Sequence, residues 1–587
     1  MNLTDDSSAS SLAPMHGLRH IGLTLSLIAV AVTSLATSAR AAPAGPGSRP
    51  NILIIVADDL GFSDIGAFGG EIDTPNLDAL AREGARLTDF HSAATCSPTR
   101  SMLLSGVDHH IAGIGSMAEI TFDEQKGKPG YEGYLNDRVV AFPALLQQAG
   151  YRTYMAGKWH LGLTEERSPK ARGFDRSFAL LRGADDHYAQ PWSTKIDPAQ
   201  PYYREDGRLA TVPADFYSSD FYGDKLVSYL REGRGDAREA RKPFFAYLTF
   251  TAPHWPLQAP EDVIAKYADR YKAGYEPIRQ ARIAKQKASG LLPKDFQPAK
   301  ALSLFPAWQR LTPSQQAQEA RRMATYAAMV DIMDRNIGKV IAQLKASGEY
   351  DNTVIVFISD NGAEGNHVAP RGDAIARDNR LANVGRANSY VGYGPNWAQV
   401  SALPFSLFKG YSYEGGITVP AIVRWPGSPQ GGKVLPTPGH VTDIAPTLLQ
   451  LAGASYPARH QGHEVAPLQG RSLVSLFEGH DELGRFDKGW ELFGQKAYRQ
   501  GDWKIVYSVP PYGPGDWQLF NLKTDRAEQV NLAAQHPEKL AELKAGYAAY
   551  SHRNGVVEVP RLAERVGQRY SSQAYFESLT AADEVAR

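Results

Sequence analysis

The strongest constraint on the fold comes from short segments in which nearly every residue is apolar. Residues 51–57 (NILIIVA), 244–250 (FFAYLTF) and 353–359 (TVIVFIS) are of this kind, and 420–425 (PAIVRW) is a shorter example. Hydrophobicity that is continuous rather than alternating is typical of strands buried on both faces. Segments with helical periodicity lie between them, the longest at 320–347. This alternation predicts an α/β fold whose large sheet is covered by helices on both faces.

The pattern changes near residue 456. Beyond this point the strand-like fragments are shorter and the turns are more frequent. The fragments are 495–499, 503–508 and 517–522, followed by a helical pattern at 537–551. We therefore expect a larger domain at 50–455, and at 456–587 a smaller α+β domain with an antiparallel sheet and a tail.

The amino-terminal segment has the features of a secretory signal. An apolar run at 21–36 follows basic residues and precedes 39–41 (ARA), which offers small residues for cleavage. We expect residues 1–41 to be a signal peptide and 42–49 a spacer, so that the protein is exported, either periplasmic or secreted. The run is shorter than the ~20 residues of a spanning helix, which predicts no stable membrane association after cleavage. An uncleaved anchor is the alternative.

The balance of charge excludes one class of partner. The chain has 63 basic residues (Lys and Arg) and 63 acidic residues, so its formal net charge is zero. No global field recruits nucleic acid or an anionic membrane. We expect no nucleic-acid partner, and any selectivity for an anion must come from a local site.

Cys96 is the only cysteine of the chain, so it cannot form an intrachain disulfide. It lies in 94–100 (ATCSPTR), among hydroxyl residues, a proline and an arginine. A free cysteine is most often a small buried hydrophobe, but these polar neighbours favour a reactive site. Pro98 suits the first turn of a helix. Cys96 would then lie at a helix N-terminus, where backbone N–H groups favour anions, with the charge of Arg100 one turn further on.

Polar side chains follow four of the predicted strands. Since ligands of open α/β sheets bind outside the carboxyl ends of the strands, these residues are candidates for one site. They are Asp58 and Asp59 after 51–57, Asp360 and Asn361 after 353–359, Lys158 and His160 after a further strand at 151–156, and His254 after 244–250. Lys409 in a Phe-Lys-Gly segment is a further candidate cation. Loops after strands are often polar, but four such ends together favour a receptor for a compact oxyanion ester.

Asp58, Asp59, Asp360 and Asn361 offer only hard oxygen donors. This set suits Ca²⁺ or Mg²⁺, whereas zinc would be expected to recruit histidine or thiolate. The alternative is that each pair only caps a helix or forms an Asx turn. Carboxylates brought together from two strand ends repel one another without a cation between them, which favours the metal.

Two motifs of the chain resemble the signatures of a known family. Cys96-Ser97-Pro98-Thr99-Arg100 resembles the C-x-P-x-R signature of type I (formylglycine-dependent) sulfatases, and 150–160, from GYRT to GKWH, resembles their second signature. The resemblance extends from about residue 50 to about 557 and is strongest to bacterial arylsulfatases. A small departure is Ser105, where the family often has threonine. The resemblance implies an alkaline-phosphatase-like fold, with a large mixed sheet sandwiched by helices, for a sulfatase catalytic domain at 50–455.

The resemblance also implies a mechanism and a set of roles. A separate formylglycine-generating enzyme would convert Cys96 to Cα-formylglycine, whose hydrate attacks the sulfur of a small-molecule sulfate ester and later expels sulfate by C–O cleavage. The implied metal is one Ca²⁺, with the residue at position 96 near the ion. The implied metal ligands are Asp58, Asp59, Asp360 and Asn361. Arg100 and Lys158 would hold the hydrate, His160 would accept the proton that triggers sulfate release, and His254 and Lys409 would flank the sulfate, one of them protonating the leaving alcohol.

Other functions stay open at this level. The leading prediction is an exported sulfuric ester hydrolase of the arylsulfatase type. A phosphonate monoester or phosphodiester hydrolase with the same aldehyde chemistry is the alternative, and a catalytically silent binding protein is the third. Two polar clusters, 108–110 (DHH) and 185–187 (DDH), are predicted either to line the substrate pocket or to cap helices and turns. The basic stretch 261–316 is predicted to be a solvated helical insertion.

Overall fold

The computed structural model describes residues 49–190, 202–366, 377–480, 483–567, 575, 576, 578 and 579. The predicted signal peptide at 1–41 and all but the last residue of the predicted spacer lie outside the described residues. Within the described parts of the chain, no helix is both long enough and apolar enough to cross a membrane.

A ten-stranded mixed sheet forms the centre of the fold, in the order β11-β2-β10-β9-β1-β8-β4-β5-β6-β7. Its central strands β9 (Thr353–Ser359), β1 (Asn51–Ala57), β8 (Phe244–Thr249) and β4 (Arg152–Lys158) are parallel neighbours. Antiparallel pairing of β10 with β9 and of β6 with β5 makes the sheet mixed. The outer strands are β11 (Val434–Leu435), β2 (Ala85–Leu87), β10 (Ala421–Arg424), β5 (Arg176–Leu180), β6 (Tyr203–Glu205) and β7 (Arg208–Ala210). This confirms the predicted fold class.

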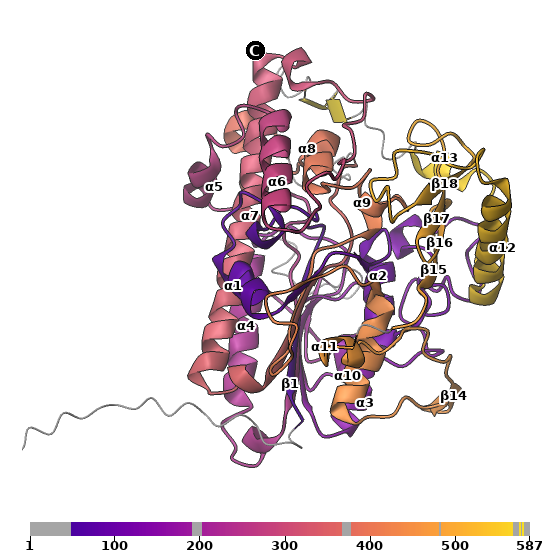
Figure 1. The fold of residues 1–587 in the computed structure, drawn as a ribbon. Helices are drawn as coiled ribbons and strands as arrows, with labels where there is room; N and C mark the ends of the chain where they lie inside the picture. Colours follow the sequence, from indigo (N-terminus) through magenta and orange to yellow (C-terminus); the bar gives the residue numbers. More distant parts are fainter. Residues whose placement is uncertain are drawn as a thin grey trace, which may run out of the picture. The chain divides into compact units, whose positions relative to one another are not determined.

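Helices cover both faces of this sheet (Figure 1). Leu53 and Ile55 of β1 belong to a core shared with α4 (Ser218–Glu232) and α7 (Pro313–Ala346). Ile52 and Ile54 point to the opposite face, as alternate residues of a strand do, into a core shared with other helices. These are α2 (Cys96–Ser105), α3 (Phe142–Gln148) and α10 (Ile444–Ala452). Burial on both faces explains why the sequence of β1 is continuously apolar.

The remaining elements are shorter or lie outside these layers. The helices are α1 (Pro75–Glu83), α5 (Glu261–Tyr267), α6 (Tyr275–Ala288), α8 (Gly394–Ser401), α9 (Glu414–Ile417), α11 (Val474–Phe477), α12 (Pro537–Asn554) and α13 (Leu562–Gly567). The short strands are β3 (Phe90–His91), β12 (Gly439–His440), β13 (Arg459–His460) and β14 (His463–Glu464).

A second, antiparallel sheet follows in the C-terminal part of the chain. Its strands pair in sequence order and are β15 (Asp487–Leu492), β16 (Gln495–Gln500), β17 (Trp503–Tyr507) and β18 (Trp517–Asn521). Helix α12 packs on this sheet through Leu543 and Tyr547. The sheet is joined to the α/β layers by a hydrogen bond from Trp490 Nε1 to Ser92 O (2.9 Å) and by buried ion pairs. The antiparallel sheet agrees with the prediction, while the domain boundary at 455/456 stays a prediction.

Candidate functional site

The parallel strands bring their polar ends to one edge of the sheet. Asp58 and Asp59 directly follow β1, and Asp360 and Asn361 directly follow the neighbouring strand β9. Asn361 Nδ2 donates to Asp59 Oδ1 (2.6 Å), and the backbone N–H of Asp59 donates to Asp360 Oδ1 (3.3 Å). Lys158 is the last residue of β4, two strands away from β1 in the sheet order. Register between neighbouring strands therefore creates this cluster, as the sequence predicted.

Each carboxylate of the cluster is paired with one cation. Lys158 Nζ lies 2.6 Å from Asp58 Oδ2. Arg100 Nη2 lies 2.8 Å from Asp360 Oδ2. The third cation, Lys409, lies 2.8 Å from Asp59. All of these side chains are buried. Because Lys409 Nζ also lies 3.0 Å from the buried carboxylate of Glu364, three cations face four carboxylates inside the protein.

Cys96 is the first residue of α2 and is 1% exposed. Its Sγ lies 3.9 Å from Asp59 Oδ1. Burial raises the pKa of this thiol well above its ordinary value, although Lys158 and Lys409 act in the opposite direction. The thiol is therefore protonated at neutral pH, and a protonated thiol is a poor nucleophile. An unmodified Cys96 is badly suited to attack an ester.

Two observations show that a hard cation fits between the carboxylates. Asp58 Oδ1 and Asn361 Oδ1 are buried and accept no hydrogen bond from any residue that the structure describes. Burial, reinforced by Asp360 and Asp59 against the opposing charge of Lys158, raises the pKa of Asp58 to about 7. Buried oxygens without partners and crowded carboxylates are what a Ca²⁺ or Mg²⁺ ion satisfies. Potential ligand atoms of Asp58, Asp59, Cys96 and His254 also lie within 4.8 Å of one another.

His160 is held by a carboxylate that sequence reasoning missed. Its Nε2 lies 3.2 Å from Glu119 Oε1, whereas its buried Nδ1 has no hydrogen-bond partner among the described residues. Burial lowers the pKa of His160, and Glu119 acts against that shift. Glu119 lies in a short 3-10 helix, Ala118–Ile120, whose sequence has no pattern that marks it. The pairing leaves Nδ1 as the ring nitrogen free to accept a proton.

Two residues of the site have left-handed backbones. Asp59 has a φ of 66° and His160 a φ of 58°. Such conformations are uncommon for residues other than glycine, and they concentrate at functional sites because the surrounding structure must hold them there. The two conformations cost local stability, and they set the directions in which the side chains of Asp59 and His160 point into the site.

His254 is fixed from both sides. Its Nδ1 lies 2.6 Å from Trp255 O, and its Nε2 lies 3.5 Å from Asp59 Oδ2. Burial, with the nearby charges of Lys409 and Lys158, lowers its pKa well below the ordinary value. His187 Nε2 contacts the backbone oxygen of His254 at 3.0 Å. Within the 185–187 cluster, His187 therefore helps to hold the backbone of His254 in place.

The 108–110 cluster fits the second of its two predicted roles, since Asp108 Oδ1 accepts a hydrogen bond from the backbone N–H of His110 in a turn (3.0 Å). His110 is buried between Asp108 (2.8 Å from Nδ1) and Glu491 of β15 (3.0 Å from Nε2). Tyr550 of α12 donates to the other oxygen of Asp108 at 2.9 Å. The cluster therefore connects the α/β layers to the C-terminal sheet, and it lines neither of the two hollows described below.

The basic insertion is more than a solvated surface. Much of α6 is exposed, but Arg282 is fully buried and lies 2.6 Å from Asp64 Oδ1 and 2.7 Å from Glu71 Oε2. Asp64 Oδ2 accepts hydrogen bonds from Gly61 N (2.8 Å) and from Tyr326 Oη (2.6 Å). Through its ion pairs with Asp64 and Glu71, Arg282 thus holds in place the loop that follows Asp58 and Asp59. The expectation of a purely solvated insertion was wrong at this residue because its burial depends on a distant loop.

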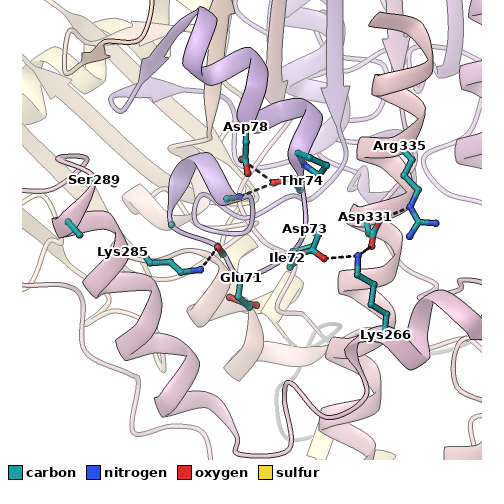
Figure 2. A pocket seen from close by; sticks show the side chains of 15 residues that line it. Glu71, Ile72, Asp73, Thr74, Asp78, Lys266, Lys285, Ser289, Asp331 and Arg335 are labelled. Carbon is teal, nitrogen blue, oxygen red and sulfur yellow. Dashed lines mark hydrogen bonds and ion pairs between the residues drawn. The ribbon is translucent and has the colours of Figure 1, made fainter. Parts of the chain in front are cut away.

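A cavity of about 420 Å³ opens beside the cluster and is lined by Thr95, His254 and Lys409. A larger hollow of about 920 Å³ lies elsewhere, between the N-terminus of α1 and helices α6 and α7. Figure 2 shows that Lys266 of this larger hollow is paired with Asp73 and Asp331, and that Arg335 is paired with Asp331. No predicted site residue lines it. The smaller cavity is therefore the one that the site's chemistry can use.

Comparison with known proteins identifies relatives along most of the chain. Residues 50–454 match the model of the family described as Sulfatase, and residues 405–546 match that described as N-sulphoglucosamine sulphohydrolase, C-terminal. An uncharacterized sulfatase of Schizosaccharomyces pombe is 46% identical over 542 residues, which cover 88% of this chain and 97% of the relative. An arylsulfatase of Klebsiella aerogenes is 40% identical over 442 residues, which cover 74% of this chain and 93% of the relative.

Solved structures share the fold. Ps i-CgsB in complex with k-i-k-neocarrahexaose has a TM-score of 0.62 at 24% identity, covering 89% of this chain and 97% of that one. A phosphonate monoester hydrolase of Agrobacterium radiobacter has a TM-score of 0.51 at 22% identity, covering 85% of this chain and 96% of that one. At these identities the likeness concerns the fold alone.

Proposed function

Since the chain belongs to the sulfatase family and is a sulfuric ester hydrolase, we propose that it is an arylsulfatase that uses formylglycine at position 96 and one bound Ca²⁺. The observation that carries the proposal is the environment of Cys96. A buried, protonated thiol lies at a helix N-terminus among three cations and four carboxylates. That environment suits a modified side chain that handles an anionic ester.

Formylglycine hydrate supplies two hydroxyl groups on one carbon, of which one attacks sulfur and the other drives the later expulsion of sulfate. Arg100 lies one turn further along α2 and orients the formylglycine at position 96. Arg100 is itself held by an ion pair with Asp360 and by a hydrogen bond from its Nη1 to Lys158 O (2.9 Å). His160 accepts the proton of the second hydroxyl at Nδ1, because Glu119 occupies Nε2. General base catalysis of this kind contributes roughly 10²–10⁴-fold.

Lys409 and His254 flank the sulfate in this proposal. Lys409 stays protonated, because the surrounding carboxylates outweigh the effect of burial and raise its pKa well above the ordinary value. His254 is held neutral by burial and by the neighbouring lysines. One of the two protonates the leaving alcohol. Both contact Asp59, so their positions are tied to those of the metal-binding residues.

Asp58, Asp59, Asp360 and Asn361 would hold the Ca²⁺, which supplies positive charge that favours an ionised nucleophile and offsets the charge of the ester. The protein groups alone carry one excess negative charge, since the carboxylates of Asp58, Asp59, Asp360 and Glu364 face three cations. A divalent cation and a sulfate ester, which carries one negative charge, therefore bring the site to neutrality. Charge balance of this kind limits the desolvation cost of a buried site.

The test is the ratio of kcat/KM for 4-nitrophenyl sulfate to kcat/KM for an aryl phosphonate, with protein co-produced with a formylglycine-generating enzyme. The proposal expects the sulfate to be preferred by a large factor. Preference for the phosphonate would favour a phosphonate monoester hydrolase, the second candidate, whose support is the shared fold of the Agrobacterium radiobacter enzyme. Near-normal turnover by Cys96→Ala would remove the aldehyde mechanism altogether.

Export belongs to the same proposal. The signal-like segment at 1–41 would direct the chain out of the cytoplasm, after a formylglycine-generating enzyme has acted on the unfolded chain. N-terminal sequencing of the mature protein checks this. A first residue near position 42 is expected, and an intact amino terminus in exported protein would contradict cleavage.

A further inference from the structure

The cavity beside Cys96 receives the alcohol half of the substrate. Thr95, which precedes Cys96, lines it together with His254 and Lys409. Both of the latter contact Asp59 beside the nucleophile. A substrate whose sulfate lies among these groups must extend its alcohol portion into this volume of about 420 Å³, which is within the usual range of small-molecule sites.

The walls of this cavity are apolar and aromatic. They come both from the α/β layers and from the C-terminal part of the chain. The main wall residues are Met117, Ile120, Trp255, Tyr411, Phe493 and Tyr512. The rings of Tyr411 and Tyr512 lie 4.7 Å apart, and those of His254 and Trp255 lie 4.4 Å apart. Since packed rings hold one another in place, the apolar walls are formed before a ligand binds.

The charges along the cavity disfavour a second anionic group. Among the described residues that line it, Lys409 is the only lysine or arginine. Its Nζ is already shared between Asp59 (2.8 Å) and Glu364 (3.0 Å). Glu364 and Glu564 also line the cavity. A further sulfate or carboxylate on the alcohol would meet these two carboxylates, of which Glu564 is paired with Arg561. Among the described lining residues it would meet no cation that is not already paired with a carboxylate.

The cavity offers a limited number of partners for hydroxyl groups. Thr95 Oγ1 and Gln495 Oε1 line it or lie behind its wall, buried without a hydrogen-bond partner among the described residues. The side-chain amide of Asn366 donates to Glu364 Oε1 (2.7 Å) and to Lys409 O (3.3 Å), so its donors are engaged. Pro510 and Pro511 add further surface without N–H donors. A polyhydroxylated alcohol has more hydroxyl groups than Thr95 and Gln495 can pair with. It would lose some hydrogen bonds to water without replacing them, which costs free energy for each unpaired group.

We propose that this site selects sulfate esters of uncharged, apolar alcohols, both aromatic and medium-chain aliphatic, and rejects sulfated sugars, most strongly those with a second anionic group. The inference rests on the proposed sulfate ester hydrolysis and specifies its substrate class. The selecting surface is shared between the α/β layers and the C-terminal part of the chain.

The experiment uses the full chain with formylglycine at position 96 verified by mass spectrometry. The substrates are 4-nitrophenyl sulfate, n-alkyl sulfates from butyl to octyl, N-acetylglucosamine 6-sulfate and glucosamine-2-N,6-O-disulfate. Burial of one methylene is worth about 0.8 kcal/mol, or roughly fourfold in kcat/KM. We expect kcat/KM to rise by up to about fourfold per added methylene, and the disulfated sugar to be the poorest substrate.

Two variants test the assignment of the walls. Tyr512→Ala should reduce the octyl-to-butyl ratio of kcat/KM by about tenfold, as expected when roughly 50 Å² of the bound chain returns to water. Glu564→Lys should raise kcat/KM for the disulfated sugar relative to octyl sulfate. The matched control is Glu538→Lys, because Glu538 is exposed in the first turn of α12 and does not line the cavity. It should leave both ratios unchanged.

The outcomes separate the two proposals. Hydrolysis of 4-nitrophenyl sulfate together with a flat alkyl series, or with faster hydrolysis of either sugar, would overturn the substrate class and leave sulfate ester hydrolysis standing. No hydrolysis of any sulfate ester by fully converted protein would refute both. Equal responses of Glu564→Lys and Glu538→Lys would refute the role given to the charge at the cavity.

Discussion

The most distinctive prediction concerns the buried histidine that joins the two sheets. His110 lies between Asp108 and Glu491, at 2.8 Å and 3.0 Å. Burial by itself lowers the pKa of His110, but the hydrogen bonds to the two carboxylates outweigh it and raise the pKa to about 9. The perturbation is His110→Gln, which keeps a polar side chain and removes the charge.

The magnitude follows from linkage. A histidine whose pKa rises from 6.5 to about 9 on folding contributes about 3 kcal/mol to the free energy of unfolding. This contribution is fully present below the unfolded pKa, and it is lost as the pH rises through the folded pKa. The window is therefore pH 6.5 to about 9. Burial raises the pKa of Tyr131 and of Tyr550. The ring of His109 lies 4.0 Å from that of His110, and burial lowers the pKa of His109 to about 4. These neighbours therefore do not titrate inside the window.

The assay is urea unfolding, followed by tryptophan fluorescence, at about pH 6.5 and about pH 9.5. The difference in unfolding free energy between the parent protein and His110→Gln should shrink by about 3 kcal/mol between these values. His552→Gln is the control, because His552 is exposed on α12. A difference that is the same at both pH values would refute the assignment of a charged His110.

Three further predictions concern the site and its support. Chelation with EDTA should abolish turnover and added Ca²⁺ restore it, and full activity of protein shown to be metal-free would contradict the ligand set. Arg282→Met should lower the free energy of unfolding by about 3–5 kcal/mol, because Asp64 would lose its buried partner. An unchanged urea midpoint would argue against the ion pair between Arg282 and Asp64. Burial lowers the pKa of His160, and Glu119 raises it. Glu119→Gln should therefore lower the pKa of His160 and move the acidic limb of the pH profile of kcat/KM to lower pH. An unmoved limb would exclude His160 as the base.

The sequence predicted the centre of the fold well because local and tertiary preferences agree there. β1 and β9 have the predicted bounds, since strands buried on both faces have continuously apolar sequences. β15 escaped prediction because its sequence, DKGWEL, mixes charged and apolar residues without a clear period. Its place in the sheet depends on pairing with β16 and on the hydrogen bond from Trp490 to Ser92, which is distant in the chain.

The residues of the candidate site also fall into those that the sequence could predict and those that it could not. Residues at strand ends were predictable because parallel neighbours deliver them to one edge of the sheet, as with Asp59 and Asp360. Glu119 and Arg282 were not, because each acts through a partner far away in sequence. Neither lies in a motif, and a charged residue in an irregular or amphipathic segment is usually solvated. Burial alone distinguishes them, and burial is a tertiary property.

The most direct test of the account is the fraction of formylglycine at position 96, measured by mass spectrometry across preparations made with and without a formylglycine-generating enzyme. Each preparation is assayed for hydrolysis of 4-nitrophenyl sulfate. The account predicts that turnover rises in proportion to the formylglycine fraction and vanishes when Cys96 is unmodified. Undiminished turnover by protein in which Cys96 remains a thiol would contradict it.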